Sequence, residues 1–196
     1  MIEFGSIING KQVKGDEWIE VFNPYTKKLV GRVASLDTET LDKVLTDTKN
    51  TKITLTRYER YEILNKIADE LEKRVDEVSQ MITDETGLCL KDTRYEASRV
   101  SDVLRFSAMK TLDDDSEVFP CDVSKNGKPR RIYTTRVPLG LISAITPFNH
   151  PMNQVVHKIA PAIATNNTVV LKPSERTPLS AYYFAQLALD CGLPPN

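Results

Sequence analysis

Residues 138–192 read PLGLISAITPFNHPMNQVVHKIAPAIATNNTVVLKPSERTPLSAYYFAQLALDCG, and this stretch decides the fold class of the chain. The runs LGLISAIT and TVVL are short, apolar and without alternation, which favours strands buried on both faces. A helical pattern follows each run. Pro151 suits a first helical turn, Pro161 predicts a kink or break, Thr177 is a candidate cap and Gly192 a stop. Strand, helix, strand, helix in this order predicts an α/β fold with a parallel, doubly wound sheet.

The loops after these two strands carry the polar side chains of a candidate ligand site. Asn149 follows the first strand, and Lys172, Ser174 and Glu175 follow the second. Ligands of open parallel sheets bind beyond the carboxyl ends of the strands, so both groups are expected on one side. The Asn149 amide suits an oxyanion, and Glu175 suits ribose hydroxyls. The alternatives are a helix cap by Asn149 and a surface ion pair of Lys172 with Glu175. A GxGxxG fingerprint is missing, so spacing alone leaves the question open.

The upstream sequence predicts hairpins and long helices. The Asn9-Gly10 pair indicates a tight turn, and the stretch IEVFNPYTKKLVGRVA indicates a second hairpin. Apolar periodicity predicts helices over 37–51, 57–86 and 91–110, with Gly87 ending the second. The charges on the two long helices are interpreted as solvated faces. The stretch DVSKNGKPRRIYTTRV predicts a further hairpin, with Asn126-Gly127 as its turn.

Composition sets the broad class. The chain has 196 residues, of which 40% are apolar and 27% charged, so we expect a soluble globular protein. A net charge of −1 indicates neither nucleic acid nor an anionic membrane as a partner. The apolar runs fall far short of a membrane span, and the first residues lack a secretory signal. Cys89, Cys121 and Cys191 form no CxxC pair, so we expect no metal site, no disulfide framework and a cytoplasmic location.

The motifs of residues 138–196 resemble those of the aldehyde dehydrogenase superfamily. Its members carry P-W/F-N, then K-x-A-P-A-L-A-x-G-N-T-V-V-x-K-P-S-E-x-T-P, then A-G-L-P, and this chain matches them in order and spacing. The upstream NG hairpin, FNP, paired helices and TDETG are similar to the family's amino-terminal region. The resemblance implies the amino-terminal part of that fold, with hairpins, long helices and an incomplete parallel Rossmann-like sheet. It divides the chain into hairpins and helices (1–123), an oligomerisation strand arm (124–136) and the first βαβα part of the dinucleotide-binding domain (137–196).

The resemblance also implies roles for single residues. Asn149 matches the family's oxyanion-hole asparagine. The family's wall beside the nicotinamide is matched by Ile145, Thr146, Pro147 and Phe148. Its residues around the adenosine ribose are matched by Lys172, Pro173, Ser174 and Glu175. The motif FNHP (148–151) is similar to the corresponding motif of lactaldehyde and phosphonoacetaldehyde dehydrogenases. His150 and Arg105 are therefore candidate contacts for an anionic substrate, with helix-start packing and a surface arginine as the alternatives. Arg176 after Glu175 leaves both NAD and NADP open as the cofactor.

The chain departs from the family pattern in two respects. Asn166 replaces a glycine at a position suited to positive φ, which Asn tolerates better than most residues. The family's nucleophilic cysteine, general-base glutamate and phosphate loop are not recognised in the chain. The complete enzyme is expected to be a homodimer or homotetramer that oxidises a small polar or anionic aldehyde to its acid, and residues 1–196 are expected to be inactive alone. The rival hypotheses are a truncated, non-catalytic oligomerisation partner of full-length subunits and a stand-alone nucleotide-binding domain.

Overall fold

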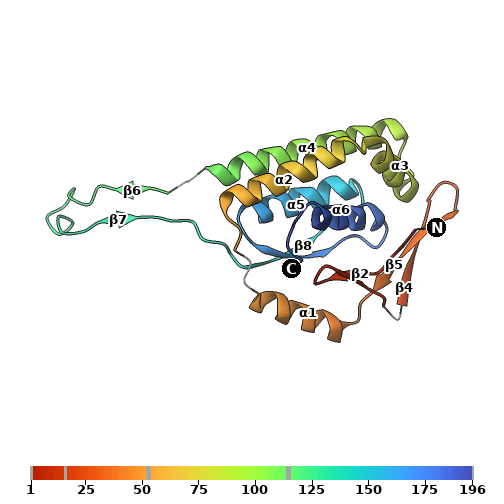
Figure 1. The fold of residues 1–196 in the computed structure, drawn as a ribbon, viewed down its shortest axis with the longest axis horizontal. Helices are drawn as coiled ribbons and strands as arrows, with labels where there is room; N and C mark the ends of the chain where they lie inside the picture. Colours follow the sequence, from red (N-terminus) through yellow and green to blue (C-terminus); the bar gives the residue numbers. More distant parts are fainter. Residues whose placement is uncertain (1, 16, 52–53, 114–115, 196) are drawn as a thin grey trace.

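The computed structural model describes residues 2–15, 17–51, 54–113 and 116–195 (Figure 1). The elements, in chain order, are β1 (Ile2–Phe4), β2 (Ser6–Ile8), β3 (Lys11–Val13), β4 (Glu17–Phe22), β5 (Leu29–Ser35), α1 (Thr38–Asn50), α2 (Arg57–Glu72), α3 (Val75–Thr86), α4 (Leu90–Leu112), β6 (Val118–Phe119), β7 (Ile132–Tyr133), β8 (Leu141–Ile145), α5 (Pro151–Ala164), β9 (Thr168–Lys172) and α6 (Leu179–Asp190). The mixed α/β class predicted from the sequence is confirmed.

The pair β8–β9 is parallel, as predicted, and runs in register from Leu141 opposite Thr168 to Ile145 opposite Lys172. Helices α5 and α6 lie over it, and α2, α3 and α4 form an outer layer (Figure 1). The prediction that both strands are buried on both faces is wrong. Only Ala144 is buried in β8, and no residue of β9 is. Two strands make a narrow sheet, so their edges and part of one face stay open to solvent.

The helix predicted over 57–86 is two helices. Helix α2 ends at Glu72, and α3 starts at Val75 after Arg74 leaves the helical region with φ −116° and ψ 18°. No glycine or proline lies between the two helices, so the chain gives no local signal of the break. The turn lets α3 pack against both α4 and α6, and tertiary packing therefore decides the bend.

Pro161 does not end its helix. Helix α5 continues to Ala164, and its last turn is closed by the Thr165 N–H bonding to the Pro161 carbonyl at 3.1 Å. The loss of one N–H donor is tolerated because Ile159 and Ile163, on either side of the proline, are buried in the core. The predicted positive φ at Asn166 is confirmed at 59°. The residue turns the chain from α5 into β9.

The predicted amino-terminal hairpins are both present. Strands β2 and β3 are joined by Asn9 and Gly10, whose φ values of 50° and 71° suit a tight two-residue turn. Strands β4 and β5 pair antiparallel, and the Asn23 side chain closes their connection by accepting the N–H groups of Tyr25 and Thr26. Gly87 ends α3 at φ 74°, as predicted.

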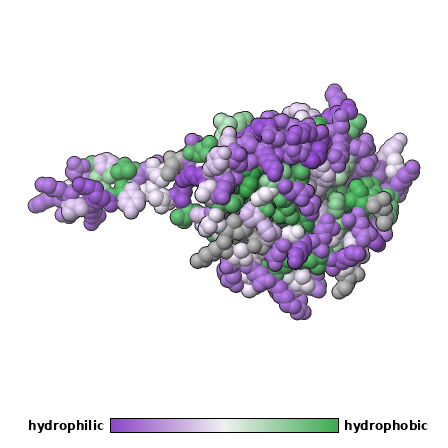
Figure 2. Space-filling view, viewed as in Figure 1, coloured by the Kyte–Doolittle hydropathy of each residue, from purple (hydrophilic) through white to green (hydrophobic). Residues whose placement is uncertain are grey.

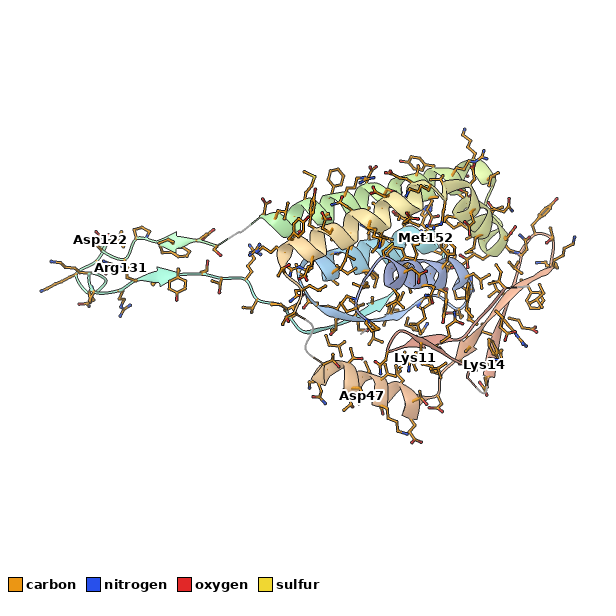
Figure 3. The ribbon with its side chains drawn as sticks, viewed as in Figure 1. Lys11, Lys14, Asp47, Asp122, Arg131 and Met152 are labelled. Atoms are coloured by element: carbon orange, nitrogen blue, oxygen red, sulfur yellow. The ribbon has the colours of Figure 1, made fainter. Side chains whose placement is uncertain are left out.

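The predicted third hairpin differs in detail. Strand β6 pairs with β7, so the hairpin also includes Val118 and Phe119, which lie upstream of the stretch that predicts it. Asn126-Gly127 does not form a tight turn between strands but lies inside a wide loop, in which the Gly127 N–H bonds to the Ser124 carbonyl. Gly127 is buried there, and a Cβ at this position would lie 1.7 Å from the Cys121 carbonyl oxygen. The arm extends away from the body, with Asp122 and Arg131 near its far end (Figure 3).

The core lies between the helical layers. It consists of apolar side chains of α2, α3, α4, α5 and α6, among them Leu64, Ile67, Leu71, Ile82, Leu104, Met152, Val156 and Phe184. Met152, labelled in Figure 3, is fully buried one residue after the start of α5. This core holds α5 and α6 in place, and therefore the loops that precede them.

Candidate functional site at the carboxyl ends of the parallel strands

The loops after β8 and β9 lie side by side. The Thr146 N–H continues the sheet by donating to the Lys172 carbonyl at 3.2 Å. The Thr177 hydroxyl donates to the Phe148 carbonyl at 3.4 Å, and the Arg176 guanidinium lies 4.9 Å from the centre of the Phe148 ring. The structure thus brings together the two groups of residues that the sequence places after the strands.

Asn149 is exposed at this edge and is not used as a helix cap. The cap position of α5 belongs to His150, which makes no side-chain cap hydrogen bond, and Pro151 occupies the first turn. Within the part of the chain that the structure describes, the Asn149 amide forms no hydrogen bond. Its two N–H donors are therefore available to a ligand oxygen outside the protein.

Lys172 and Glu175 form a surface ion pair, which is the alternative to ribose binding that the sequence leaves open. Their Nζ and Oε2 atoms are 3.8 Å apart, and both side chains are exposed. The backbone N–H of Glu175, followed by the charges of Lys172 and Arg176, holds the pKa of the Glu175 carboxyl below its usual value. The carboxylate is therefore ionised and open to hydroxyl donors. Ser174 is buried, and its hydroxyl accepts the Arg176 N–H at 3.2 Å, which fixes the turn between them.

The remaining predicted wall residues border the same edge. Ile145 and Phe148 are exposed apolar side chains, 63% and 49% accessible, and Pro147 lies between Phe148 and the buried Thr146. An apolar surface beside a hydrogen-bonding pair suits a ligand with a flat ring and a sugar. Pro173 separates Lys172 from Ser174, and its carbonyl accepts a hydrogen bond from Lys172 Nζ at 3.3 Å.

His150 and Arg105 are not brought together. Nδ1 of His150 lies 3.2 Å from Oε2 of Glu96. Arg105 instead forms ion pairs from α4 to α2, at 2.9 Å to Asp69 and 2.8 Å to Glu72. Nine residues separate Arg105 from Glu96 on α4, which is about 13 Å along the helix axis.

Two buried glutamates complete the site, and the interpretation of helix charges as solvated faces misses both. Glu96 on α4 is 1% exposed and accepts the Asn153 N–H of α5 at 3.1 Å. Glu85 on α3 is 2% exposed and accepts the N–H groups of Leu179 and Ser180 at 2.7 and 3.2 Å. Thr177 is not the cap of α6, whose start at Leu179 is held by Glu85 instead. Each glutamate continues a buried helical stripe, and this position is the one sequence signal that points to them.

Burial raises the pKa of Glu85 to about 7, because the low-dielectric interior penalises the charged form more than its hydrogen bonds favour it. The charge of Glu96 acts in the same direction. The Ser180 hydroxyl also contacts the Glu85 carboxyl, so this group has a partner in either protonation state.

The three cysteines are separate. Cys191 is buried, which raises the pKa of its thiol, whereas Cys89 is exposed and Cys121 partly so. Among the residues that the structure describes, no three His, Cys, Asp or Glu side chains gather as a metal ion requires. No helix in the described ranges is long and apolar enough to cross a membrane.

Comparisons with known proteins agree with this geometry. A family model described as "Aldehyde dehydrogenase family" matches residues 11–196. The 3-sulfolactaldehyde dehydrogenase of Priestia aryabhattai is 36% identical over 98% of this chain and 40% of its own length. The lactaldehyde dehydrogenase of Methanococcus vannielii is 35% identical over 92% of this chain and 38% of its own length.

A solved structure matches as well. The NADP-dependent glyceraldehyde-3-phosphate dehydrogenase of Bacillus halodurans C-125, complexed with NADP, superposes with a TM-score of 0.93 at 31% identity. The match covers 99% of this chain and 42% of that one. The chain therefore spans about two fifths of the length of the curated relatives it matches.

Proposed function

The chain belongs to the aldehyde dehydrogenase family, and from this membership we propose that the protein oxidises a small aldehyde to its carboxylic acid with NAD or NADP. The observation that carries the proposal is the Asn149 amide, which is exposed and unbonded among the described residues at the edge where Lys172 and Glu175 meet. As the aldehyde carbon is attacked, its oxygen gains negative charge. The two N–H donors of the Asn149 amide, in the loop just before α5, would stabilise that charge without adding a titrating group.

The residues of the second loop fit the sugar of the cofactor. When bound, NAD or NADP would accept a hydride from the aldehyde carbon. The ionised Glu175 would accept hydrogen bonds from ribose hydroxyls, and Lys172 would donate to the same sugar. Ile145 and Phe148 offer apolar surface to the nicotinamide side. Arg176 lies on the Phe148 ring beside Glu175, and a 2′-phosphate would have to draw it from that ring.

We propose an anionic aldehyde as the substrate, with His150 as its contact. His150 follows Asn149 directly, its side chain is 42% exposed, and its Nδ1 lies 3.2 Å from Oε2 of the Glu96 carboxylate. The names of two similar proteins, a sulfolactaldehyde and a glyceraldehyde-3-phosphate dehydrogenase, also point to anionic aldehydes. Arg105 would have to give up Asp69 and Glu72 to join the site, so His150 carries this role in our proposal.

The protein expressed from its complete natural reading frame should reduce NAD or NADP when given a small anionic aldehyde, and absorbance at 340 nm measures it. Sulfolactaldehyde, glyceraldehyde 3-phosphate and lactaldehyde form the panel, each with both cofactors. Residues 1–196 expressed alone are the control and should be silent, because covalent catalysis needs an activated thiolate beside a base. Cys191 is buried, and the described residues provide no such pair at Asn149. A complete protein that leaves every aldehyde of the panel unchanged would overturn the proposed function.

We also propose that the arm formed by β6, β7 and the loop between them binds a second copy of the protein. The arm and the segment that follows it expose a group of apolar side chains: Val118, Phe119, Val123, Ile132, Tyr133, Val137 and Leu139 (Figure 2). A two-stranded hairpin that stands away from the body is marginally stable by itself, and its edges lack partners. Packing on a second subunit would bury these side chains and pair an edge.

The double variant Val118→Glu, Tyr133→Lys should lower the oligomer mass, as measured by light scattering. These residues face each other in the hairpin, so the opposite charges keep the strand pair while removing its apolar surface. The melting temperature of the variant should stay close to that of the parent protein, because the arm lies outside the helical core. Glu62→Ala on α2, which is exposed and distant from the arm in sequence, is the control. An unchanged mass at micromolar concentration would contradict this assembly.

A further inference from the structure

The helices that follow β8 and β9 start without a side-chain cap of their own. Neither His150 before α5 nor Pro178 before α6 provides a cap hydrogen bond. The first N–H groups of a helix need acceptors, because no helical carbonyl reaches them. In both helices the acceptor is a buried glutamate from the outer layer, Glu96 for α5 and Glu85 for α6.

The Glu96 carboxylate divides its two oxygens between the helix and the loop before it. Oε1 accepts the Asn153 N–H at 3.1 Å, and Oε2 lies 3.2 Å from Nδ1 of His150. Because His150 follows Asn149 directly, this one side chain fixes both the backbone after Asn149 and the ring beside it. We name residues 146–150 the oxyanion loop.

Glu85 acts in the same way on the other helix. Its Oε2 accepts the Leu179 N–H at 2.7 Å, and its Oε1 accepts the Ser180 N–H at 3.2 Å and contacts the Ser180 hydroxyl. Leu179 follows the segment that carries Lys172 and Glu175, which we name the ribose loop (172–178). Thr177 in this loop is buried, and its hydroxyl donates to the Phe148 carbonyl.

Glutamate is rarely this buried unless it is paired. His150 lies beside Glu96, and among the described residues neither glutamate forms an ion pair with a lysine or arginine. Burying a carboxylate is unfavourable, and an apolar side chain would fill either site with less loss of solvation. What each carboxylate adds is a fixed link from one helix start to the outer layer. Both links end at the same edge of the β8–β9 pair.

We propose that Glu96 and Glu85 are positioning residues, Glu96 for the oxyanion loop and Glu85 for the ribose loop. The proposal rests on the proposed function, because it assigns the two loops different roles in aldehyde oxidation. It separates those roles kinetically. Loss of Glu96 should act on the chemical step through Asn149, and loss of Glu85 should act on cofactor binding through Lys172 and Glu175.

The test compares alanine and glutamine variants of both residues in the protein expressed from its complete natural reading frame. Glu96→Ala should lower kcat about tenfold to 100-fold with the KM for cofactor within about twofold, since a displacement of about 1 Å near the chemistry has an effect of that size. Glu85→Ala should raise the KM for cofactor about tenfold or more and change kcat less.

The glutamine variants distinguish the loss of hydrogen bonds from the loss of side-chain volume. Glu96→Gln keeps an acceptor oxygen for the Asn153 N–H, and its amide N–H can donate to Nδ1 when the His150 proton moves to Nε2, so it should recover most of kcat. Glu85→Gln keeps one acceptor for two N–H groups, so its KM for cofactor should lie between those of the parent and Glu85→Ala. Glu62→Ala, exposed on α2, is the matched control and should leave both constants unchanged. The proposal would be overturned if both alanine variants changed kcat and the KM for cofactor by the same factors. It would also be overturned if neither variant differed from Glu62→Ala.

Amide hydrogen exchange separates failure of this proposal from failure of the proposed function. In Glu96→Ala the faster exchange should be confined to the start of α5, and in Glu85→Ala to the start of α6. If the parent protein oxidises no aldehyde, this measurement still decides the positioning. Exchange that rises uniformly, or not at all at these helix starts, counts against it.

Discussion

Replacing Asn149 with alanine should lower kcat for aldehyde oxidation about 100-fold to 1000-fold, which is the effect of removing one oxyanion donor in other enzymes. The KM for the aldehyde should change little, because the ground-state carbonyl oxygen carries much less charge than the oxygen in the transition state. The structure supports a direct role. The amide is exposed, caps no helix, and makes no hydrogen bond to the described residues, so its removal leaves no protein group unsatisfied.

Two further variants make this result specific. Asn149→Asp has nearly the same shape but accepts hydrogen bonds only, so it should be at least as inactive as Asn149→Ala. Asn126→Ala removes an exposed amide in the arm and should leave kcat unchanged. Steady-state absorbance at 340 nm gives both constants, and thermal unfolding confirms that each variant is folded. A kcat for Asn149→Ala within about threefold of the parent would remove Asn149 from the oxyanion role.

The parts of the fold that could be predicted from the sequence are those determined by residues close together in the chain. Asn9-Gly10 sets a hairpin turn because both residues tolerate positive φ, and Asn166 turns the chain after α5 for the same reason. The parallel pair follows from two apolar runs separated by one helical pattern. The meeting of Asn149 with the Lys172–Glu175 pair follows in turn, because parallel strands in register end at one edge.

The parts that were missed depend on partners far away in the chain. The break between α2 and α3 has no glycine or proline to indicate it and follows from packing on α4 and α6. Glu85 accepts the N–H groups of Leu179 and Ser180, which lie more than ninety residues later in the chain, with a separation of 94 to Leu179. A carboxylate on a long charged helix gives no local sign of being buried. The position of Glu85 is explained by the start of α6, which has no side-chain cap of its own.

The same nonlocal packing predicts the largest effect on stability. Phe184→Ala should lower the free energy of unfolding by about 3–5 kcal/mol, the range for truncating a buried phenylalanine, through lost transfer energy and the cavity left behind. Phe184 is 1% exposed on α6 and is among the largest fully buried side chains of the described core. Urea unfolding followed by circular dichroism measures the change. The slope m should equal that of the parent, so that a shifted midpoint reports a change in stability.

Phe106 on α4 provides the matched control, because it is the same side chain at 69% exposure. Phe106→Ala should change the free energy of unfolding by less than about 0.5 kcal/mol, since it removes little buried apolar surface. The difference between the two variants therefore isolates burial from the intrinsic preference of alanine for helices, which favours both substitutions equally. If Phe184→Ala were no more destabilising than Phe106→Ala, α6 would not be packed into the core. The link from Glu85 through the start of α6 to the ribose loop would then lose its rigid support.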